Sequence, residues 1–500
     1  MFVKLSEVSL KKIITTLNSG MGHDGIHSVF LKGADEEFLS KLASFYNTCF
    51  THCYIPIDLL IGIINPLVKD SKANITEVSN YRPVMQSSCL LKIFECHILN
   101  ILSEKISFNP RQFGFMKGVS TTDTCFLLKE IMHDHSRNRR TGILTFMDLS
   151  KAFDRVDHFM LGNKLMKENI PIDIIYILMH YFRNQTAKIV WSDASSAYFP
   201  IEWGVRQGSI LSPFLFKFYV NSIITDISNM EEGCSLGLSK VNILAYADDI
   251  VLVASHISDM NVLYESLKQA LHHHGLLVNR SKTKCLLFGS KYKQNCPTSV
   301  VLGDDDLEVV KSYKYLGHYT EGTLSDDKDI EHKLMKFYAS TNSVLRNFKN
   351  VDVNTLLFLF SSYCKPFYGL TLWNNKSSFN RCIYKSLNVA YNNALKKILG
   401  IPLYASNHLT AVKCGHLLLK HQIALLQANY YFRLLKSDVP IIRINLPFLK
   451  RGYFFNYIYD LFKVLYEVEL SHHSPDIKKS GIISVQMHNE RRGRCPYFLI

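Results

Sequence analysis

Two adjacent carboxylates interrupt one of the most apolar stretches of this 500-residue chain. Residues 242–254 read NILAYADDIVLVA, so Asp248 and Asp249 stand where a buried strand would otherwise continue. Ionised carboxylates are costly to bury unless a cation or hydrogen-bond donors compensate them. The β-branched and aliphatic flanks favour two short strands joined by a tight turn that presents both acids. A pair of hard oxygen ligands of this kind is typical of a site for Mg²⁺ or Mn²⁺.

A third acidic residue, Asp148, follows a second apolar segment. Residues 142–148 read GILTFMD, and the residues after them, rich in Ala, Phe, Val and Leu, are expected to open a helix. Asp148 therefore ends a predicted strand and can meet Asp248 only through tertiary structure, which is how two-metal phosphoryl-transfer centres are assembled. The alternative is that Asp148 caps the following helix and that Asp248 and Asp249 form a polar turn.

Turn-forming and basic segments surround these acids. Residues 204–213 read GVRQGSILSP, in which the glycines allow close backbone approach and the Ser-Pro pair can begin the apolar helix expected at 214–224. Residues 258–275 predict an amphipathic helix with an N-cap at Ser258 and a stop at Gly275. Residues 276–289, LLVNRSKTKCLLFG, predict two strands around a basic turn.

The order of these motifs resembles that of the reverse transcriptases of non-LTR (LINE-type) retrotransposons. The resemblance covers most of the chain and rests on NPLVK at 65–69, NYRPV at 80–84, QFGF at 112–115, FMDLSKAFDRVDH at 146–158, GVRQGSILSP, YADD, NRSKTKCLLFG at 279–289 and YKYLG at 313–317. YADD alone is a moderate signal, whereas this many matches in one order exclude coincidence. The fold class implied is α+β: a right-hand polymerase with fingers, a palm containing an antiparallel sheet, a helical thumb and a helical C-terminal region.

The resemblance implies roles for individual residues. Asp148 and Asp248 would bridge two metal ions, Mg²⁺ or alternatively Mn²⁺, with Asp249 in support. Phe153 would stack under the sugar of the incoming nucleotide and exclude a 2′-hydroxyl; the alternative is a core aromatic. Lys282 would lie near the leaving pyrophosphate, with Lys284 as the competing candidate, and Arg82 would hold the triphosphate. Gln207 and Gly208 would line the nucleotide pocket. The primer grip would be formed by Tyr315, Leu316 and Gly317.

The activity implied is RNA-directed DNA synthesis. The partners would be an RNA template, a DNA primer and deoxynucleoside triphosphates, with the primer extended by two-metal phosphoryl transfer. The alternatives are a catalytically silent nucleic-acid-binding remnant of a retroelement and another palm polymerase, such as an intron maturase. The complete set of three acids with Gln207-Gly208 favours the enzyme, and AFDRVDH followed by YADD disfavours a maturase. We expect no endonuclease to be encoded in this chain.

Composition agrees with a nucleic-acid partner without requiring one. The chain has 57 Lys and Arg against 43 Asp and Glu, a formal charge of +14, which suits a phosphate backbone. Twelve cysteines form no paired framework and the N-terminus does not resemble a signal peptide, so we expect a cytoplasmic or nuclear protein that is not secreted. Charged residues and prolines break the most apolar stretches, so no membrane partner is expected.

The expected organisation has four parts. Residues 1–47 would form an N-terminal helical extension, 48–320 the fingers and palm, 321–440 a helical thumb and connector, and 441–500 a C-terminal tail region with a basic stretch at 490–494. Helical spacing recurs after residue 324, around 390–399 and at 417–435. Basic residues here are expected either to follow a primer–template duplex or to form solvated helix faces: Lys333, Lys336, Arg346, Lys349, Lys396 and Lys397.

Overall fold

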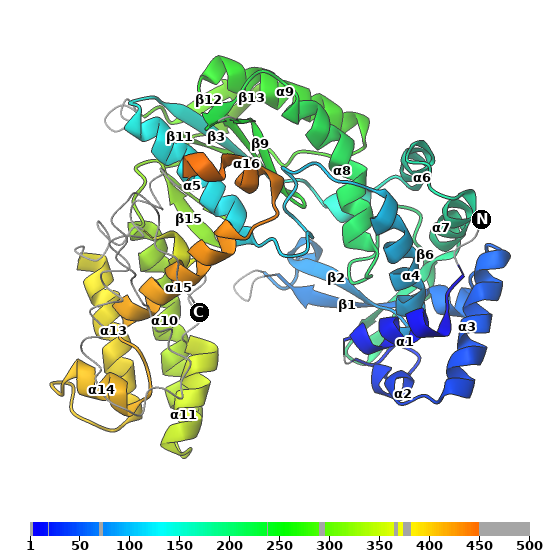
Figure 1. Cartoon of the computed structure of the whole chain (residues 1–500), viewed down its shortest axis with the longest axis horizontal. Helices are drawn as coiled ribbons and strands as arrows, with labels where there is room; N and C mark the ends of the chain where they lie inside the picture. The colour runs from blue at the N-terminus through cyan, green and yellow to red at the C-terminus, as the bar shows by residue number, and fades with distance from the viewer. Residues whose placement is uncertain are drawn as a thin grey trace, which may run out of the picture.

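The protein combines helices and several small sheets. The computed structural model describes residues 4–18, 20–69, 74–237, 239–289, 296–364, 369–373 and 382–449. A central sheet lies between a group of N-terminal helices and a group of C-terminal helices (Figure 1). This mixed architecture agrees with the α+β expectation. The predicted basic stretch at 490–494 lies outside the described residues.

The central sheet joins segments that are far apart in the sequence. Its order is β11 (Lys284–Phe288), β3 (Gly142–Met147), β10 (Asp249–Ala254) and β9 (Ile243–Tyr246), and every neighbouring pair is antiparallel. All six residues of β3 are buried, although successive residues point to opposite faces. Ile143 and Leu144, for example, belong to two different core clusters. The sheet is therefore covered on both faces, which explains why its strands read as continuous apolar runs.

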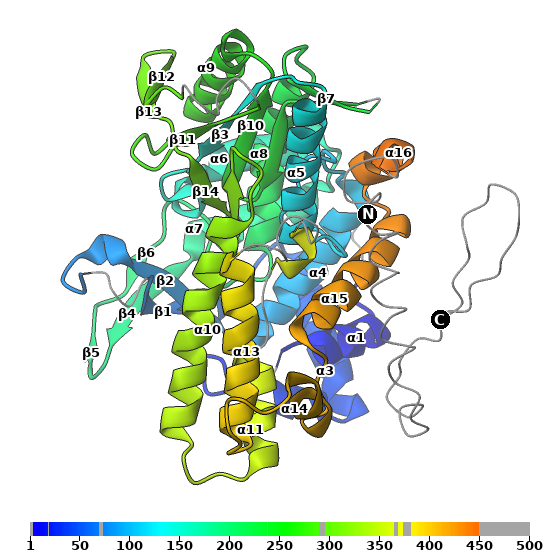
Figure 2. The same ribbon diagram turned by 90° about the vertical axis from the view of Figure 1, so that its left-hand side faces the viewer.

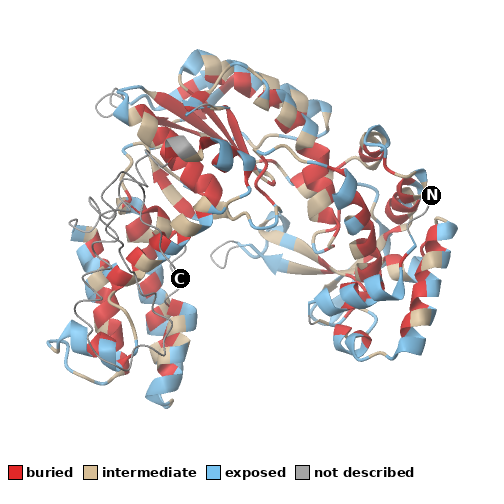
Figure 3. Ribbon diagram, in the orientation of Figure 1, coloured by how far each residue is buried: buried red, intermediate tan, exposed pale blue. Residues whose placement is uncertain are grey.

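Helices cover the two faces of this sheet. α8 (Ser212–Ser228) and α9 (Ile257–His273) pack in one core cluster, and α5 (Thr121–Arg137) packs in the other. α9 carries buried residues on one side and exposed residues on the other, whereas α5 and α8 are mostly buried (Figure 3). The apolar helix predicted after the Ser-Pro pair is confirmed, with Pro213 in its first turn. The N-cap predicted at Ser258 is wrong, because the last extended residue before α9 is His256.

Two local predictions around the acids need correction. The helix expected directly after Asp148 is a single 3-10 turn, Ala152–Arg155, because Lys151 adopts a left-handed conformation with φ of 50°. The regular helix α6 (His158–Lys167) begins only where the side chain of Asp157 caps it. Residues 276–289 contain one strand, β11, rather than two, because the amides of Lys282 and Thr283 turn back onto the carbonyl of Asn279.

A second sheet lies in the expected fingers region. β1 (Ile61–Val68) pairs antiparallel with β2 (Tyr81–Gln86) and parallel with β4 (Thr186–Trp191), and β4 also pairs with the short strands β5 (Ala194–Ser195) and β6 (Phe199–Pro200). Figure 2 shows these strands extending away from the helical body. The helices on this side are α1 (Glu7–Thr16), α2 (Ser28–Lys32), α3 (Glu36–Thr51), α4 (Cys89–Lys105) and α7 (Ile172–Asn184).

From Asp327 onwards the described residues form helices and no strands, as the spacing after residue 324 predicts. The long helices of this part are α10 (Asp327–Asn347), α13 (Cys382–Ile398) and α15 (Leu419–Leu435), which lie together in Figure 1. Shorter helices are α11 (Val353–Leu359), α14 (Asn407–Lys413) and α16 (Pro440–Leu449). The remaining hairpins are β7 (Cys234–Leu236) with β8 (Ser239–Val241), β12 (Ser299–Leu302) with β13 (Asp305–Glu308), and β14 (Ser312–Tyr315) with β15 (His318–Glu321).

The structure corrects two of the expected surface cations, and three of the expected boundaries fall inside helices or strands. Lys333 is buried and forms an ion pair with Asp329, and buried Lys396 donates a 2.7 Å hydrogen bond to the carbonyl of Leu403. Neither lysine is free to follow a duplex. The boundary at residue 47 falls within α3, because the buried face of that helix continues through Phe50. The boundaries at 320 and 440 likewise fall within β15 and α16.

Candidate active site

The turn between β9 and β10 presents Asp248 and Asp249. Tyr246 and Asp249 are the last paired residues of this hairpin, so Ala247 and Asp248 make a two-residue turn. Ala247 has φ of 59°, in the left-handed region that two-residue hairpins use. Asp248 is half-buried and Asp249 is exposed. The predicted pair of strands with a tight acidic turn is confirmed.

Asp148 lies at the same end of the sheet. β3 and β10 are antiparallel with Met147 opposite Ile250, and one position further along this register Asp148 comes beside Asp249. Directly opposite residues in such a pair have Cα atoms about 4.5–5.5 Å apart. The alternative that Asp148 caps a helix is wrong, because α6 is capped by the side chain of Asp157.

Lys282 forms an ion pair with one of these acids. Its Nζ lies 3.4 Å from Oδ2 of Asp148, and the side chain is largely exposed. The competing candidate, Lys284, forms an ion pair with Glu308 at 2.7 Å. The structure therefore separates two lysines that the sequence leaves equivalent, and it places Lys282 beside the acids.

The carboxyls of Asp248 and Asp249 both have raised pKa values. The pKa of Asp249 is raised to about 6, first because protein atoms displace water around its carboxyl and then because of the negative charges of Asp248 and Asp148, although the residue keeps exposed surface. Burial and the charge of Asp148 also raise the pKa of Asp248, while the positive charges of Arg82 and Lys282 oppose that rise. A divalent cation bound here would relieve this repulsion, because its own charge would dominate the local field.

The donor set fits a hard divalent cation that a nucleotide would help to hold. Among the residues that the structure describes, no group of three or more His, Cys, Asp or Glu side chains is arranged to hold a metal ion by itself. Mg²⁺ at phosphoryl-transfer sites usually takes one or two carboxylates and completes its shell with waters and substrate phosphates. Asp148 and Asp248 satisfy that smaller requirement. The convergence of all three carboxylates on one pair of ions stays a prediction.

Phe153 is held by aromatic contacts on the core side. It lies in the 3-10 turn after Asp148, is half-buried, and stacks on Phe216 of α8 with ring centroids 4.6 Å apart and planes 17° apart. Its ring also meets Phe115 edge to face at 6.4 Å. The carbonyl of Phe153 accepts a 2.9 Å hydrogen bond from the amide of Val205. The ring is thus fixed against α8, and the backbone of Phe153 is tied to the segment that leads to Gln207.

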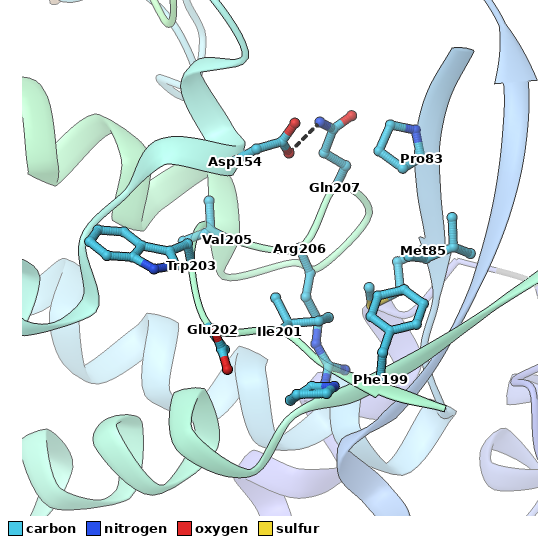
Figure 4. Close-up of a pocket in the computed structure, with 12 residues that line it drawn as sticks. Pro83, Met85, Asp154, Phe199, Ile201, Glu202, Trp203, Val205, Arg206 and Gln207 are labelled. Carbon is cyan, nitrogen blue, oxygen red and sulfur yellow. Dashed lines mark hydrogen bonds between the residues drawn. The ribbon is translucent and has the colours of Figure 1, made fainter. Parts of the chain in front are cut away.

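Gln207 lines a small cavity beside Phe153. The cavity has a volume of about 270 Å³, and its walls include Pro83, Met85, Asp154 and Trp203 (Figure 4). The side-chain amide of Gln207 donates a 3.0 Å hydrogen bond to Oδ1 of Asp154. Sequence reasoning did not single out Asp154, whose only signal is its place directly after Phe153. The contact directs the side-chain amide of Gln207 toward Asp154 at one side of the cavity (Figure 4).

The conformation of Gly208 explains why glycine stands there. Gly208 has φ of 123°, and a Cβ atom at this position would lie 2.5 Å from the carbonyl oxygen of Met85. The amide of Met85 in turn donates a 2.7 Å hydrogen bond to the carbonyl of Gln207. The loop thus packs its backbone against β2, the strand that carries exposed Arg82. The two predicted nucleotide-binding segments are adjacent.

The predicted primer grip is a tight hairpin turn beside the central sheet. Leu316 and Gly317, with φ of 46° and 82°, form the two-residue turn between β14 and β15. The side chain of Tyr315 is buried, with its ring centroid 5.3 Å from that of Phe146 on β3. Tyr315 therefore anchors the hairpin in the core, and the turn residues are the part available for contact.

Comparison with known proteins supplies the family. The family profile described as Reverse transcriptase (RNA-dependent DNA polymerase) matches residues 69–320, about half of the chain. The chain belongs to this family, and its mixed helix and sheet architecture is consistent with a right-hand polymerase fold.

Individual relatives are distant in sequence. The Pol polyprotein of the type-2 retrotransposable element R2DM of Drosophila melanogaster is 23% identical over 320 residues, 63% of this chain and 30% of that protein. The RNA-directed DNA polymerase of the mobile element jockey, also from Drosophila melanogaster, is 24% identical over 428 residues, 81% of this chain and 45% of that protein. The chain thus spans less than half of the length of either relative.

Among solved structures, telomerase from Candida Tropicalis in complex with the TWJ fragment of telomeric RNA is similar at 12% identity and a TM-score of 0.39. That match covers 86% of this chain and 68% of the telomerase chain. Within the described ranges, no helix of the protein is both long enough and apolar enough to cross a bilayer.

Proposed function

We propose that this chain is an RNA-directed DNA polymerase of a non-LTR retrotransposon. The observation that carries the proposal is the register of β3, β10 and β9, which brings Asp148 to the same sheet end as the Asp248-Asp249 turn. Two strand-borne acidic sites at one edge are what a two-metal phosphoryl-transfer centre requires. Membership of the reverse transcriptase family supports the same reaction.

The proposed substrates are an RNA template, a DNA primer and deoxynucleoside triphosphates. Bound Mg²⁺, or Mn²⁺ in its place, would supply charge stabilisation for the attacking and leaving oxygens. Asp148 and Asp248 would hold the ions with Asp249 in support. Arg82 and Lys282 would neutralise phosphate charge, and both lie close enough to influence Asp248 electrostatically. Guanidinium and ammonium groups serve this purpose at many phosphate sites.

The remaining assignments concern orientation. Phe153, braced by Phe216, would support the sugar of the incoming nucleotide, and Gln207 with Gly208 would line its pocket. The turn of Leu316 and Gly317 would guide the primer end. We assign the four sequence regions to an N-terminal extension, fingers and palm, thumb with connector, and tail, with boundaries moved to the ends of α3, β15 and α15. The cysteines of the described residues are all free, which supports a reducing cytoplasmic or nuclear compartment.

Primer extension tests the proposal directly. Purified chain with Mg²⁺ should extend a DNA primer on an RNA template, and Asp248→Ala should lower the rate by about 1,000-fold or more, because removing a metal ligand takes away several kcal/mol of transition-state stabilisation. Template–primer affinity should stay within about twofold, since backbone contacts are distributed over many cations. Asp306→Ala, at an exposed position on β13, is the matched control.

Two results would contradict this reading in different ways. If the wild-type chain binds RNA but never extends a primer, the alternative of a catalytically silent nucleic-acid-binding remnant would be correct. Extension by Asp248→Ala at the wild-type rate would remove Asp248 from the reaction while leaving the polymerase activity standing.

A further inference from the structure

The turn that carries the acids is held by a buried glutamine from another part of the chain. Oε1 of Gln112 accepts two hydrogen bonds of 3.1 Å, one from the amide of Ala247 and one from the amide of Gly114. The side chain of Gln112 is fully buried, and its Nε2 has no hydrogen-bond partner. Only the oxygen therefore contributes hydrogen bonds, and one of its two donors lies inside the acidic turn.

The segment around Gln112 runs alongside β9 like an additional strand. The amide of Phe113 donates to the carbonyl of Ala245 at 2.8 Å, and the amide of Ala245 donates to the carbonyl of Arg111 at 2.9 Å. Gly114 lies so close to the turn that a Cβ atom on it would be 2.3 Å from the nitrogen of Ala247. The backbone of this segment and the backbone of the turn are thus in direct contact over several residues.

Ala247 needs such support because of its conformation. A left-handed φ costs a residue with a Cβ atom roughly 1–2 kcal/mol, and a buried amide without a partner adds a further penalty. The hydrogen bond to Gln112 satisfies the amide only while the left-handed conformation is kept. Loss of the acceptor would leave the Ala247 amide unpaired and would allow the turn to relax, and Asp248 and Asp249 would move with it.

We propose that Gln112 is a positioning residue that sets the backbone of the acidic turn and so the placement of Asp248 and Asp249. Gln112 acts through the amide of Ala247 and not on the substrate. The consequence for metal binding and for the rate of extension rests on the proposed function. The consequence for the backbone of the turn does not.

The test compares Gln112→Met, which keeps the length and removes the acceptor, with the same change at another buried glutamine, Gln427→Met. The side chain of Gln427 donates hydrogen bonds to the carbonyls of Leu370 and Trp373, outside the acidic turn. Hydrogen exchange measured on peptides covering residues 244–250 should be at least 10-fold faster in Gln112→Met and unchanged in Gln427→Met. Mn²⁺ binding followed by electron paramagnetic resonance should weaken by about fivefold or more in Gln112→Met alone.

Extension kinetics complete the test. The kcat of Gln112→Met should fall by about 100-fold, the loss expected from a misplacement of about 1 Å, while the Kd for template–primer and the KM for nucleotide stay within twofold. A purely structural role would lower thermal stability and affinity together and would leave the Mg²⁺ concentration for half-activity unchanged. If Gln112→Met does not fold, Gln112→Asn replaces it, since it keeps the amide and shortens the side chain by one carbon.

The outcomes separate this inference from the proposed function. Wild-type exchange at residues 244–250 in folded Gln112→Met would overturn the inference even if the enzyme is active. A wild-type chain without polymerase activity would overturn the proposed function, and the exchange and Mn²⁺ measurements would still decide whether Gln112 positions the turn.

Discussion

Replacing Gly114 with alanine should disturb the acidic turn more than any surface change. The new Cβ atom would lie 2.3 Å from the nitrogen of Ala247, 3.0 Å from the carbonyl carbon of Tyr246 and 3.1 Å from the Cα of Ala247. Non-bonded carbon atoms prefer separations of about 3.5–4.0 Å. All three neighbours are backbone atoms, so no flexible side chain can swing away, and the turn has to move by about 1 Å.

The displacement sets the size of the expected effect. Overpacking of this kind costs about 1–3 kcal/mol of folding stability, which corresponds to a fall in Tm of roughly 2–10 °C. A misplacement of about 1 Å at reacting groups lowers the rate by about 100-fold. The variant should therefore remain folded and bind template–primer normally, yet lose most of its kcat.

The assay is single-turnover primer extension on RNA, with Tm from circular dichroism and the Kd from a filter-binding titration. Gly20→Ala is the control, because a Cβ atom there meets no atom within 4 Å. A Gly114→Ala variant with the kcat of the wild type would refute the argument, since it would mean that the turn tolerates the displacement or that its placement does not limit the reaction.

Two further predictions concern neighbouring residues. Phe153→Val removes the ring that stacks on Phe216 and should raise kcat/KM for a ribonucleotide, relative to the matched deoxynucleotide, by about 10-fold. The reason is that a pocket rejects an added hydroxyl only where its wall is rigid. An unchanged ratio in an active variant would mean that Phe153 is only a core residue. Asp249 has a folded pKa raised to about 6 from an ordinary 3.8, so its ionisation costs stability as pH rises from 4 to 6. In the absence of metal, Asp249→Asn should therefore raise the free energy of unfolding at pH 7 and leave it unchanged near pH 4. The gain at pH 7 should be only about 1 kcal/mol, because solvent screens the charge of this exposed residue. Equal gains in urea unfolding at both pH values would contradict the charge argument.

The residue pattern alone determined the local structure that carries the acids. Aliphatic and β-branched neighbours on both sides of Asp248 and Asp249 allow only strands joined by a short turn, and the Ser-Pro pair begins α8 where it was expected. The helical spacing after residue 324 likewise predicted α10, α13 and α15. These features follow from preferences that act within a few positions along the chain. The ordered motifs then supplied the family, which the family profile confirms.

Tertiary structure decided which polar residues belong to the site. Lys282 and Lys284 are two positions apart in the sequence, yet Lys282 forms an ion pair with Asp148 and Lys284 forms one with Glu308. Lys333 has the sequence context of a surface cation, yet its partner Asp329 is buried with it.

Gln112 showed no signal beyond its place in QFGF, because its role depends on the amide of Ala247, which only the folded chain brings within reach. Burial, ion pairing and backbone contact are properties of pairs of residues. Where the members of a pair are far apart in the sequence, only the packing of β3, β9 and β10 with their neighbours brings them together.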